Sequence, residues 1–445
     1  MQASILSAGA PTVGIYTLGC KVNQYESEAI GEALSDRGFF VQNAALPCHV
    51  YIINTCTVTA ESDRKARQFI RRARKQNPEA YILVTGCLAQ TNAASIAAIP
   101  GVDFICGNRD KMRVVDAVVA LWEKGQKNEQ AVIAVQPLDG ADFEPMCIRK
   151  FDRTRAYVKI EDGCESHCTY CIIPSARGHI RSKPADEVVR EVGALTEGGC
   201  REVVLTGIET ASWGRDLAGA DLAELLAAVD AIPGIGRVRL GSLDPSLMKQ
   251  RFVDRIASLR SLAPQFHLSM QSGSNAVLAR MKRKYNRDMA LAGMERLRAA
   301  LPEVQFTTDI IVGFPGESEE DFAQTVDLVR RARFLMVHVF PYTKRVGTPA
   351  AVMPDQLPES VKHERVAALS AEAARIRGEI LSEMVAKRRE CEVLFETMTD
   401  GIATGHTPDF VQVSVPVACD LHAQVHRVRL CAVKEDGSGC VGELI

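Results

Sequence analysis

A short apolar run followed by a polar, helix-like segment recurs three times near the start of the chain, and each apolar run ends at a cysteine. The runs are residues 13–19, 50–55 and 81–86, and they end at Cys20, Cys56 and Cys87. Strands that alternate with helices at this period predict βαβ units, and hence a parallel sheet covered by helices on both faces. Because parallel strands place their carboxyl ends along one edge, we expect the three cysteines to be neighbours in space.

The pattern leaves other interpretations of these cysteines open. A free cysteine is often a small buried apolar residue, and this holds for each one separately. Cys106 follows a fourth strand-like run, residues 102–105, so the pattern does not exclude it as a further ligand. Cys48 and Cys147 lie away from strand ends, and we interpret them as structural.

A second group of three cysteines lies in one short loop. Cys164, Cys168 and Cys171 have C-x-x-x-C-x-x-C spacing. They follow a β-like run at residues 157–160, which predicts a position at the carboxyl end of a strand, where α/β proteins bind ligands. Three thiolates so close together can bind three irons of a cubane 4Fe-4S cluster and leave the fourth iron open to a small molecule.

Two other kinds of site fit this loop less well. Zinc takes four tetrahedral ligands, and the candidates for a fourth, His167 and His179, are adjacent to Cys168 or lie beyond Pro174. Disulfides are disfavoured, because residues 1–11 contain no basic segment before an apolar core and therefore no secretory signal.

The composition is that of a soluble protein with two to four domains. The chain has 445 residues, of which 47% are apolar and 24% charged, and its apolar runs are too short to span a membrane. We therefore expect a cytoplasmic protein. Its 14 cysteines indicate metal or iron–sulfur ligation in a reducing compartment. The formal net charge of −2 excludes a globally basic nucleic-acid binder, so RNA contacts would have to come from local patches.

The motifs around both cysteine groups resemble those of one enzyme family. The loop, with Tyr170 just before its last cysteine, resembles the radical S-adenosylmethionine (SAM) enzymes. The segments T-L-G-C-K-V-N-Q-Y-E, N-T-C-T-V-T and T-G-C resemble the amino-terminal domain of the methylthiotransferases, a family of that superfamily. The resemblance implies two 4Fe-4S clusters. Cys164, Cys168 and Cys171 would hold the one that binds SAM, and Cys20, Cys56 and Cys87 would hold an auxiliary one, without Cys106.

The same resemblance implies five SAM contacts at the ends of successive strands, and it assigns no side chain as catalytic. Tyr170 corresponds to the aromatic residue beside the adenine, and Glu209 to the carboxylate that meets the methionine ammonium. Ser242, Gln271 and Val312 complete the set. Ser242 lies in a Leu-Gly-Ser sequence where the family has a doubled serine.

We predict an α/β protein with four parts. Residues 11–122 form the methylthiotransferase amino-terminal domain with a parallel sheet, and residues 123–149 form a polar linker. Residues 150–380 form a partial (β/α)6 radical SAM barrel, and residues 381–445 form a small antiparallel β-barrel that resembles the TRAM RNA-binding domain. A long charged helix, at about residues 359–389, is interpreted as solvated or as a bridge between domains.

The resemblance also implies a reaction. One SAM would methylate sulfur held at the auxiliary cluster, a second would be cleaved at the other cluster, and methylthio would be transferred to the substrate radical. Within the family the chain looks most like the enzyme that modifies threonylcarbamoyladenosine beside the tRNA anticodon. Isopentenyladenosine in tRNA and a ribosomal-protein aspartate are the alternative substrates, and a non-catalytic iron–sulfur RNA-binding protein is the alternative of another class. Expected partners are tRNA, a sulfur donor and a low-potential electron donor such as flavodoxin or ferredoxin.

The predicted RNA contacts are local. From residue 391 to 445 three basic residues stand against eight acidic ones, so the last domain is expected to contribute shape and contacts from His406, Arg427 and Arg429. Basic residues cluster instead on the helix after Cys56, at residues 64–75, and around Tyr285, at residues 280–287. Either cluster could be a solvated surface or a tRNA contact.

Overall fold

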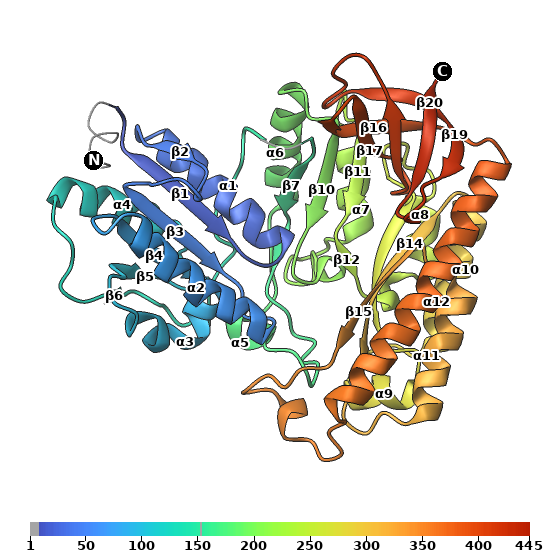
Figure 1. Cartoon of the computed structure of the whole chain (residues 1–445), viewed down its shortest axis with the longest axis horizontal. Helices are drawn as coiled ribbons and strands as arrows, with labels where there is room; N and C mark the ends of the chain where they lie inside the picture. Colours follow the sequence, from blue (N-terminus) through green and yellow to red (C-terminus); the bar gives the residue numbers. More distant parts are fainter. Residues whose placement is uncertain (1–8, 152–153) are drawn as a thin grey trace. The chain divides into compact units, whose positions relative to one another are not determined.

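The computed structural model describes residues 9–151 and 154–445 (Figure 1). The chain divides into two compact units. The first contains the described residues up to Lys150 together with Tyr157–His167 and Cys171–Pro184, and the second contains the other described residues. Most of the segment on which the signal-peptide argument rests, residues 1–8, lies outside the described part.

The first unit is built on a parallel sheet of order β2-β1-β3-β4-β5-β6, in which each strand pairs in parallel with the next. Its strands are β1 (Thr12–Thr17), β2 (Phe40–Gln42), β3 (Val50–Thr55), β4 (Tyr81–Gly86), β5 (Phe104–Ile105) and β6 (Val132–Ile133). Its helices include α1 (Lys21–Ser35), α2 (Ala60–Gln76), α3 (Cys87–Ala97) and α4 (Arg113–Lys124). The predicted alternation of strand and helix is therefore confirmed. β6 lies within the stretch that we predicted to be a linker.

Both faces of this sheet are covered, as the apolar character of its strands requires. Along β3, Tyr51 and Ile53 pack in one hydrophobic cluster with residues of α2 and α3, whereas Val50 and Ile52 pack in another with residues of α1 and α4. Successive side chains of a strand point to opposite faces, so a strand that is buried on both sides is apolar throughout.

Short elements surround the cysteine loop. After β7 (Ala156–Lys159), strand β8 (Glu161–Asp162) pairs antiparallel with β9 (Arg181–Ser182), and the loop and α5 (Ile173–Arg177) lie between them. The backbone N–H of Cys164 donates to the carbonyl of Gly178 at 3.0 Å. The loop is thus closed at its base by backbone hydrogen bonds.

The second unit contains parallel strands connected by helices (Figure 1). β10 (Glu202–Thr206) pairs with β11 (Arg237–Leu240), and a four-stranded sheet follows in the order β12 (Ser242–Leu243), β13 (Gln265–Gln271), β14 (Gln305–Val312), β15 (Met336–Pro341). The helices are α6 (Ala185–Glu197), α7 (Leu222–Asp230), α8 (Gln250–Ile256), α9 (Asn275–Arg280), α10 (Arg287–Ala300) and α11 (Glu319–Ala332), with 3-10 turns η1 (Thr210–Ser212), η2 (Pro245–Leu247) and η3 (Pro349–Val352). Gly241 separates β11 from β12, which belong to different sheets.

The carboxyl-terminal part of the second unit is a closed barrel of order β16-β17-β18-β20-β19. Its strands are β16 (Glu390–Thr399), β17 (Ile402–His406), β18 (Gln412–Pro416), β19 (Val425–Val433) and β20 (Cys440–Leu444). The predicted small barrel is confirmed, with one difference. β18 and β20 pair in parallel, so the barrel is mixed and not wholly antiparallel.

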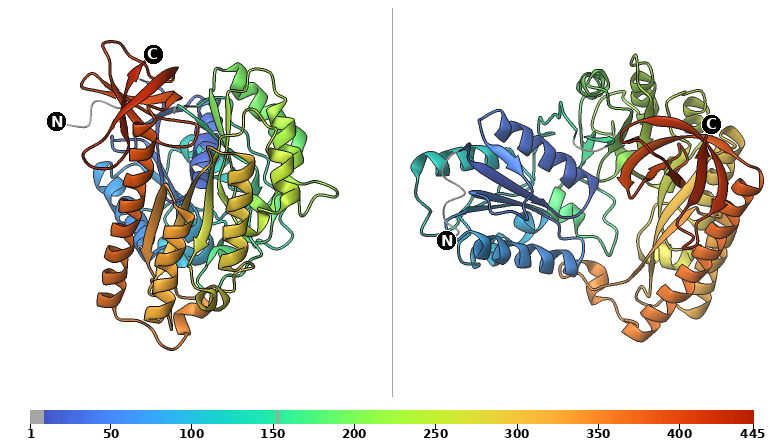
Figure 2. Two further views of the ribbon diagram at one scale, coloured as in Figure 1. Left: turned by 90° about the vertical axis from the view of Figure 1, so that its right-hand side faces the viewer. Right: turned by 45° about the horizontal axis from the view of Figure 1, so that its top comes forward.

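The long helix predicted near residue 359 is α12 (Glu359–Ala386), which packs against α11, β15 and β19 and so connects the parallel sheet to the barrel (Figure 2). Its buried residues recur at intervals of three and four, for example Arg365, Leu369, Ala373, Ile376 and Ile380, and form one stripe along the helix. Among the described residues, no helix has both the length and the apolar character needed to cross a lipid bilayer.

Candidate functional site

The first three cysteines lie at one edge of the first unit's sheet. In the parallel register Thr17 is opposite Asn54, and Asn54 is opposite Thr85. Cys20, Cys56 and Cys87 follow these positions by two or three residues. The sulfurs of these three cysteines interact electrostatically with one another, which requires them to be close. The arrangement follows from the strand order, because β1, β3 and β4 are adjacent.

Glycines allow this close approach immediately before two of the cysteines. Gly19 and Gly86 both have φ of +97°, a conformation that side chains rarely adopt. A Cβ on Gly19 would lie 2.8 Å from the Cys56 sulfur, and one on Gly86 would lie 2.4 Å from the Thr55 carbonyl oxygen. The chain therefore turns at these points without filling the space beside the sulfurs.

Hydrogen-bond donors surround this first cysteine group. The backbone N–H of Val58 donates to the Cys56 sulfur at 3.5 Å, and the Asn108 amide donates to the Cys87 sulfur at 3.4 Å. The guanidinium of Arg177 interacts electrostatically with the sulfurs of Cys20 and Cys87. Burial raises the pKa of Cys56 to about 11. In the metal-free protein this thiol keeps its proton at neutral pH, so binding of iron would release it.

Arg177 is held by a buried group of charges. Its guanidinium donates to Asn23 Oδ1 at 2.5 Å, to Glu26 Oε1 at 2.6 Å and to both Asp162 oxygens at 3.1 Å. Burial alone would raise the pKa of Glu26. The neighbouring cations Arg177, Lys111 and Lys159 instead hold the pKa of Glu26 well below its usual range. The network joins α1, which begins next to Cys20, to α5, which follows the second cysteine loop.

The second cysteine group shows the same preference for N–H donors. The backbone N–H groups of Ser166 and Ile173 donate to the sulfurs of Cys164 and Cys171, at 3.5 and 3.4 Å. In each case the donor lies two residues after the cysteine, as Val58 lies after Cys56.

The third sulfur of this loop has a charged donor. Arg283 Nη1 donates to the Cys168 sulfur at 3.2 Å, and its side chain is only 5% exposed. The guanidinium is fixed in turn by Asp244, at 3.0 Å, and by the carbonyl of Ser269, at 3.1 Å. Hydrogen bonds to cysteine sulfur are one of the means by which proteins set the potential of an iron–sulfur cluster.

The donor set of both groups fits a cubane cluster. Each group offers three cysteine thiols, and N–H groups donate to their sulfurs. In a cubane each thiolate binds a different iron, so the sulfurs stand apart. The buried Nε–H of Arg177 has no hydrogen-bond partner among the described residues, and a cluster held by Cys20 and Cys87 could accept a hydrogen bond from it.

Family models match both regions of the chain. Residues 12–107 match an uncharacterized protein family, UPF0004, and residues 158–329 match the Radical SAM superfamily. The chain is 39% identical to the threonylcarbamoyladenosine tRNA methylthiotransferase MtaB of Bacillus subtilis (strain 168), over 94% of this chain and 93% of the relative. The chain belongs to the radical SAM methylthiotransferase family.

Other members of the family are similar over most of their length. The enzyme of the same name from Thermotoga maritima is 37% identical over 96% of each chain. The tRNA-2-methylthio-N(6)-dimethylallyladenosine synthase of Carboxydothermus hydrogenoformans is 38% identical, over 79% of this chain and 81% of the relative. As a radical SAM protein, the chain uses SAM and a 4Fe-4S cluster.

Solved structures support the fold. The chain is similar to the radical SAM methyltransferase TsrM from Kitasatospora setae, with a TM-score of 0.55 and 15% identity over 89% of this chain and 80% of that one. A second structure of TsrM, with tryptophan and a SAM analogue bound, has a TM-score of 0.54 and is 16% identical, over 77% of this chain and 75% of that one. At this identity the likeness concerns the fold alone.

Two of the predicted SAM contacts have surroundings suited to their roles. Tyr170 is half-buried and packs against a cluster that includes Met281, Phe314 and Tyr342, which provides an apolar surface for an aromatic ligand. Glu209 follows β10, and burial, aided by Asp244, raises the pKa of its carboxyl to about 7. The positive charge of a ligand ammonium would lower this pKa and so keep the Glu209 carboxyl ionised.

The other three contacts differ in how well they are placed. Gln271 ends β13 with φ of +62°, a strained conformation of the kind that proteins keep at ligand sites. Ser242 begins β12 and is half-buried. Val312 is fully buried, and its carbonyl accepts from the N–H of Tyr342 at 2.8 Å. A contact between Val312 and a ligand would therefore have to use its backbone.

The remaining cysteines differ in exposure. Cys106 is fully buried in the hydrophobic cluster under α1 and α4, and burial raises its pKa to about 11. Cys48 is also buried, beside Gly14, as a structural residue would be. Cys147, which we also interpreted as structural, is exposed.

Sequence reasoning missed Arg283 and Arg177 as neighbours of cysteine sulfur. Arg283 lies in the basic run near Tyr285, which we considered as a tRNA contact, and its bonds to Cys168 and Asp244 are internal. Arg280 and Arg287 of the same run also form ion pairs, with Asp321 and Asp327. The sequence of a basic run does not show whether a given cation contacts RNA or pairs internally with a carboxylate or a cysteine sulfur.

The cations that we expected to contact RNA in the barrel are engaged by carboxylates. Arg427 pairs with Glu390, Arg429 pairs with Glu390 and Glu443, and His406 contacts Glu396 at 2.6 Å. On α2, by contrast, three exposed residues have no side-chain partner among the described residues, namely Arg71, Arg72 and Lys75. For that helix, both the solvated surface and the tRNA contact remain predictions.

Proposed function

We propose that this chain adds a methylthio group to threonylcarbamoyladenosine next to the anticodon of tRNA. The relatives named for this activity match nearly its whole length, at 35–39% identity. A dimethylallyladenosine enzyme matches a smaller share of the chain, which is why we place isopentenyladenosine second.

One observation carries the proposal beyond family membership. The chain contains a second group of three cysteines, Cys20, Cys56 and Cys87, gathered at one edge of a sheet and supplied with N–H donors. A radical SAM enzyme that only cleaves SAM needs the Cys164 loop alone. A second group suits a reaction that must also deliver sulfur, because the sulfur can be held by a second 4Fe-4S cluster.

Each part of the protein has a defined task in this proposal. When bound, the clusters and SAM supply a 5'-deoxyadenosyl radical, formed with one electron from an external donor, and the sulfur that is transferred. Glu209 binds the methionine ammonium of SAM, and Tyr170 packs beside its adenine. Arg177 and Arg283 hold cysteine sulfurs in place by charge and hydrogen bonds. The side chains thus bind and orient, and none has to act as an acid or a base.

The proposal requires partners that the chain does not contain. The electron comes from a low-potential donor such as flavodoxin or ferredoxin, and sulfur comes from a separate donor. We place the enzyme in the cytoplasm, where its tRNA substrate is found.

Nucleoside analysis tests the proposal directly. In tRNA from a deletion strain we expect methylthio-threonylcarbamoyladenosine to disappear and its unmodified precursor to accumulate, and expression of the gene should restore the product. Unchanged methylthio-threonylcarbamoyladenosine refutes the proposal, and loss of the methylthio-isopentenyl nucleoside assigns the second substrate.

Reconstitution tests the non-catalytic alternative. Anaerobic reconstitution should give roughly eight irons per chain and 5'-deoxyadenosine on reduction. Four irons and no 5'-deoxyadenosine would indicate a binding protein.

A further inference from the structure

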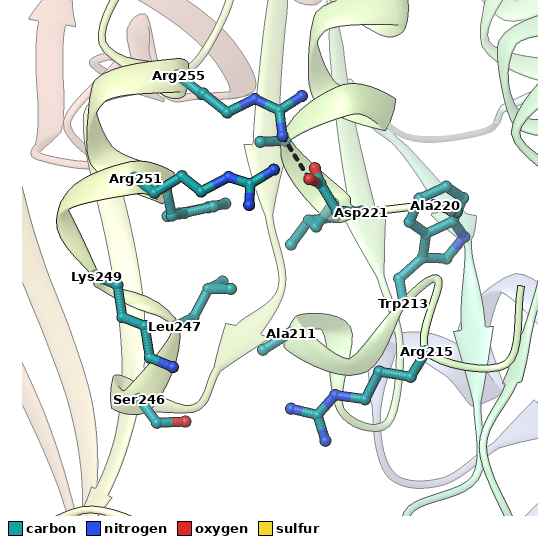
Figure 3. A pocket seen from close by; sticks show the side chains of 13 residues that line it. Ala211, Trp213, Arg215, Ala220, Asp221, Ser246, Leu247, Lys249, Arg251 and Arg255 are labelled. Carbon is teal, nitrogen blue, oxygen red and sulfur yellow. Dashed lines mark hydrogen bonds and ion pairs between the residues drawn. The ribbon is translucent and has the colours of Figure 1, made fainter. Parts of the chain in front are cut away.

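A basic pocket lies in the second unit, between the segment after β10 and the start of α8 (Figure 3). Its volume is about 360 Å³, within the range of small-ligand sites. η1 and η2 both line it, and they follow the carboxyl ends of β10 and β12. It therefore opens where α/β proteins bind ligands.

Four cationic side chains line the pocket. Figure 3 shows the head groups of Arg215, Lys249 and Arg251 directed toward the space between the two segments. All three residues are exposed, and none of these side chains forms a hydrogen bond or ion pair within residues 9–151 and 154–445. The fourth, Arg255, pairs with Asp221 and with Glu224. Three positive charges therefore face the pocket, and none of them is held by an ion pair within the described residues.

The same pocket has an apolar wall. Trp213, Leu222 and Phe252 are buried residues that line it, and Leu247 is half-buried. A site for a free inorganic anion needs only donors, and apolar side chains add nothing to it. A nucleotide, in contrast, has a charged phosphate and a ribose and base that pack against apolar surface.

The pocket adjoins a predicted SAM contact. Glu209 comes immediately before η1, and Ala211 of η1 lines the pocket. Arg215 also lies within electrostatic range of the Glu209 carboxylate. A polymer held here would pass close to the residues that position SAM.

We propose that this pocket binds a backbone phosphate of the substrate RNA, with the attached nucleoside against its apolar wall. The inference rests on the proposed function, which supplies the tRNA. The cations of the barrel differ from those of the pocket. Arg427, Arg429 and His406 are each paired with a carboxylate, which weakens their attraction for phosphate. Arg215 precedes Lys249 by 34 residues and Arg251 by 36, so no single run of basic residues in the sequence reveals the three cations.

A charge-matched pair of variants tests this. The pocket variant is R215Q/K249Q/R251Q, and the control R201Q/K387Q/R388Q removes three other exposed cations of the same unit that have no side-chain partner among the described residues. Both lose the same charge. We expect the pocket variant of the reconstituted enzyme to bind substrate tRNA roughly tenfold or more weakly at about 0.15 M salt. The slope of log K against log salt should fall in magnitude by about 0.7, because the loss of one single-strand phosphate contact removes about that much. The control should change the dissociation constant less than about twofold.

Several outcomes overturn the inference. It fails if the pocket variant binds tRNA as the control does. It also fails if inorganic phosphate, titrated alone, binds the wild type tightly and the pocket variant poorly while both bind tRNA equally, because the pocket then serves free phosphate. Formation of 5'-deoxyadenosine without RNA is measured at saturating SAM, because Arg215 lies within electrostatic range of Glu209. Under that condition it should be the same in both variants, which shows that each is folded and loaded. If the wild type does not modify tRNA at all, the proposed function has failed, and the binding comparison still reports on the pocket.

Discussion

Replacement of Glu26 by glutamine should destabilise the first unit strongly. Glu26 is 1% exposed, and three cations contact it: Arg177 at 2.6 Å, Lys159 at 3.2 Å, and Lys111. In E26Q these cations stay buried. Asp162 remains within ion-pair distance of Lys159 and Arg177, whereas Lys111 loses the carboxylate with which it pairs. Removal of one partner from a buried pair costs about 3–5 kcal/mol, which is a large part of the 5–15 kcal/mol that stabilises a typical domain.

The chain provides a matched control in the same unit. Glu61 also contacts one arginine and one lysine, Arg64 at 2.6 Å and Lys65 at 3.8 Å, but all three side chains are about half exposed. Solvent screens such surface pairs, so we expect E61Q to leave stability unchanged.

Amide hydrogen exchange, read by mass spectrometry on peptides of α1 and α5, measures the opening free energy of this region without assuming that the whole chain unfolds in one step. In E26Q the opening free energy of both peptides should fall by about 3–5 kcal/mol. In E61Q it should not change. If E26Q exchanges like E61Q and the wild type, the buried network does not stabilise the site, and the reasoning is refuted.

The effect should also depend on pH in a defined direction. The pKa of Glu26 lies well below its usual range in the folded protein, whereas in the unfolded chain it is about 4.3. The ionised group therefore stabilises the fold fully above about pH 4.5, and this contribution disappears as the pH falls through the folded-state pKa. The difference between the wild type and E26Q should stay constant from pH 8 to about pH 5 and shrink below about pH 4.

Three further predictions concern the cofactors. C87A should lose roughly half of the eight irons expected per chain, whereas C106A, which removes a buried core thiol, should lose none; equal loss in both would contradict the assignment. R283Q should lower the reduction potential of the loop cluster by on the order of 50 mV, because a positive charge and a donor to Cys168 are removed; redox titration followed by EPR measures this, and an unchanged potential would show that the contact is only structural. SAM should bind more tightly as the pH rises through about 7, the pKa of Glu209, because the ammonium needs the carboxylate; equilibrium dialysis should show this trend in the wild type and its absence in E209Q.

The architecture of the first unit could be predicted because its sequence repeats. β1, β3 and β4 are largely apolar and each is followed closely by a cysteine, so the shared edge of the three cysteines followed from the parallel pairing rule. The separation of β11 from β12 at Gly241 could not be predicted, because the backbone there passes close to Thr206 and Thr210, whose hydroxyls lie 3.1 Å from where a Cβ would be. The parallel pairing of β18 with β20 also depends on barrel closure, which alternating apolar residues do not encode.

The use of each cation was the least predictable feature, and it decides which surfaces can meet RNA. Charge runs are visible in a sequence, but whether a carboxylate neutralises them depends on residues far along the chain. Arg283 belongs to a conspicuous basic run, but its guanidinium donates to Asp244, 39 residues away, and to the sulfur of Cys168, 115 residues away. Arg215 and Arg251 belong to no such run and are left without a partner among the described residues at the mouth of a pocket. In a chain whose net charge is −2, attraction for RNA must come from cations that folding leaves uncompensated, so the pocket and the exposed face of α2 are where RNA binding should be sought.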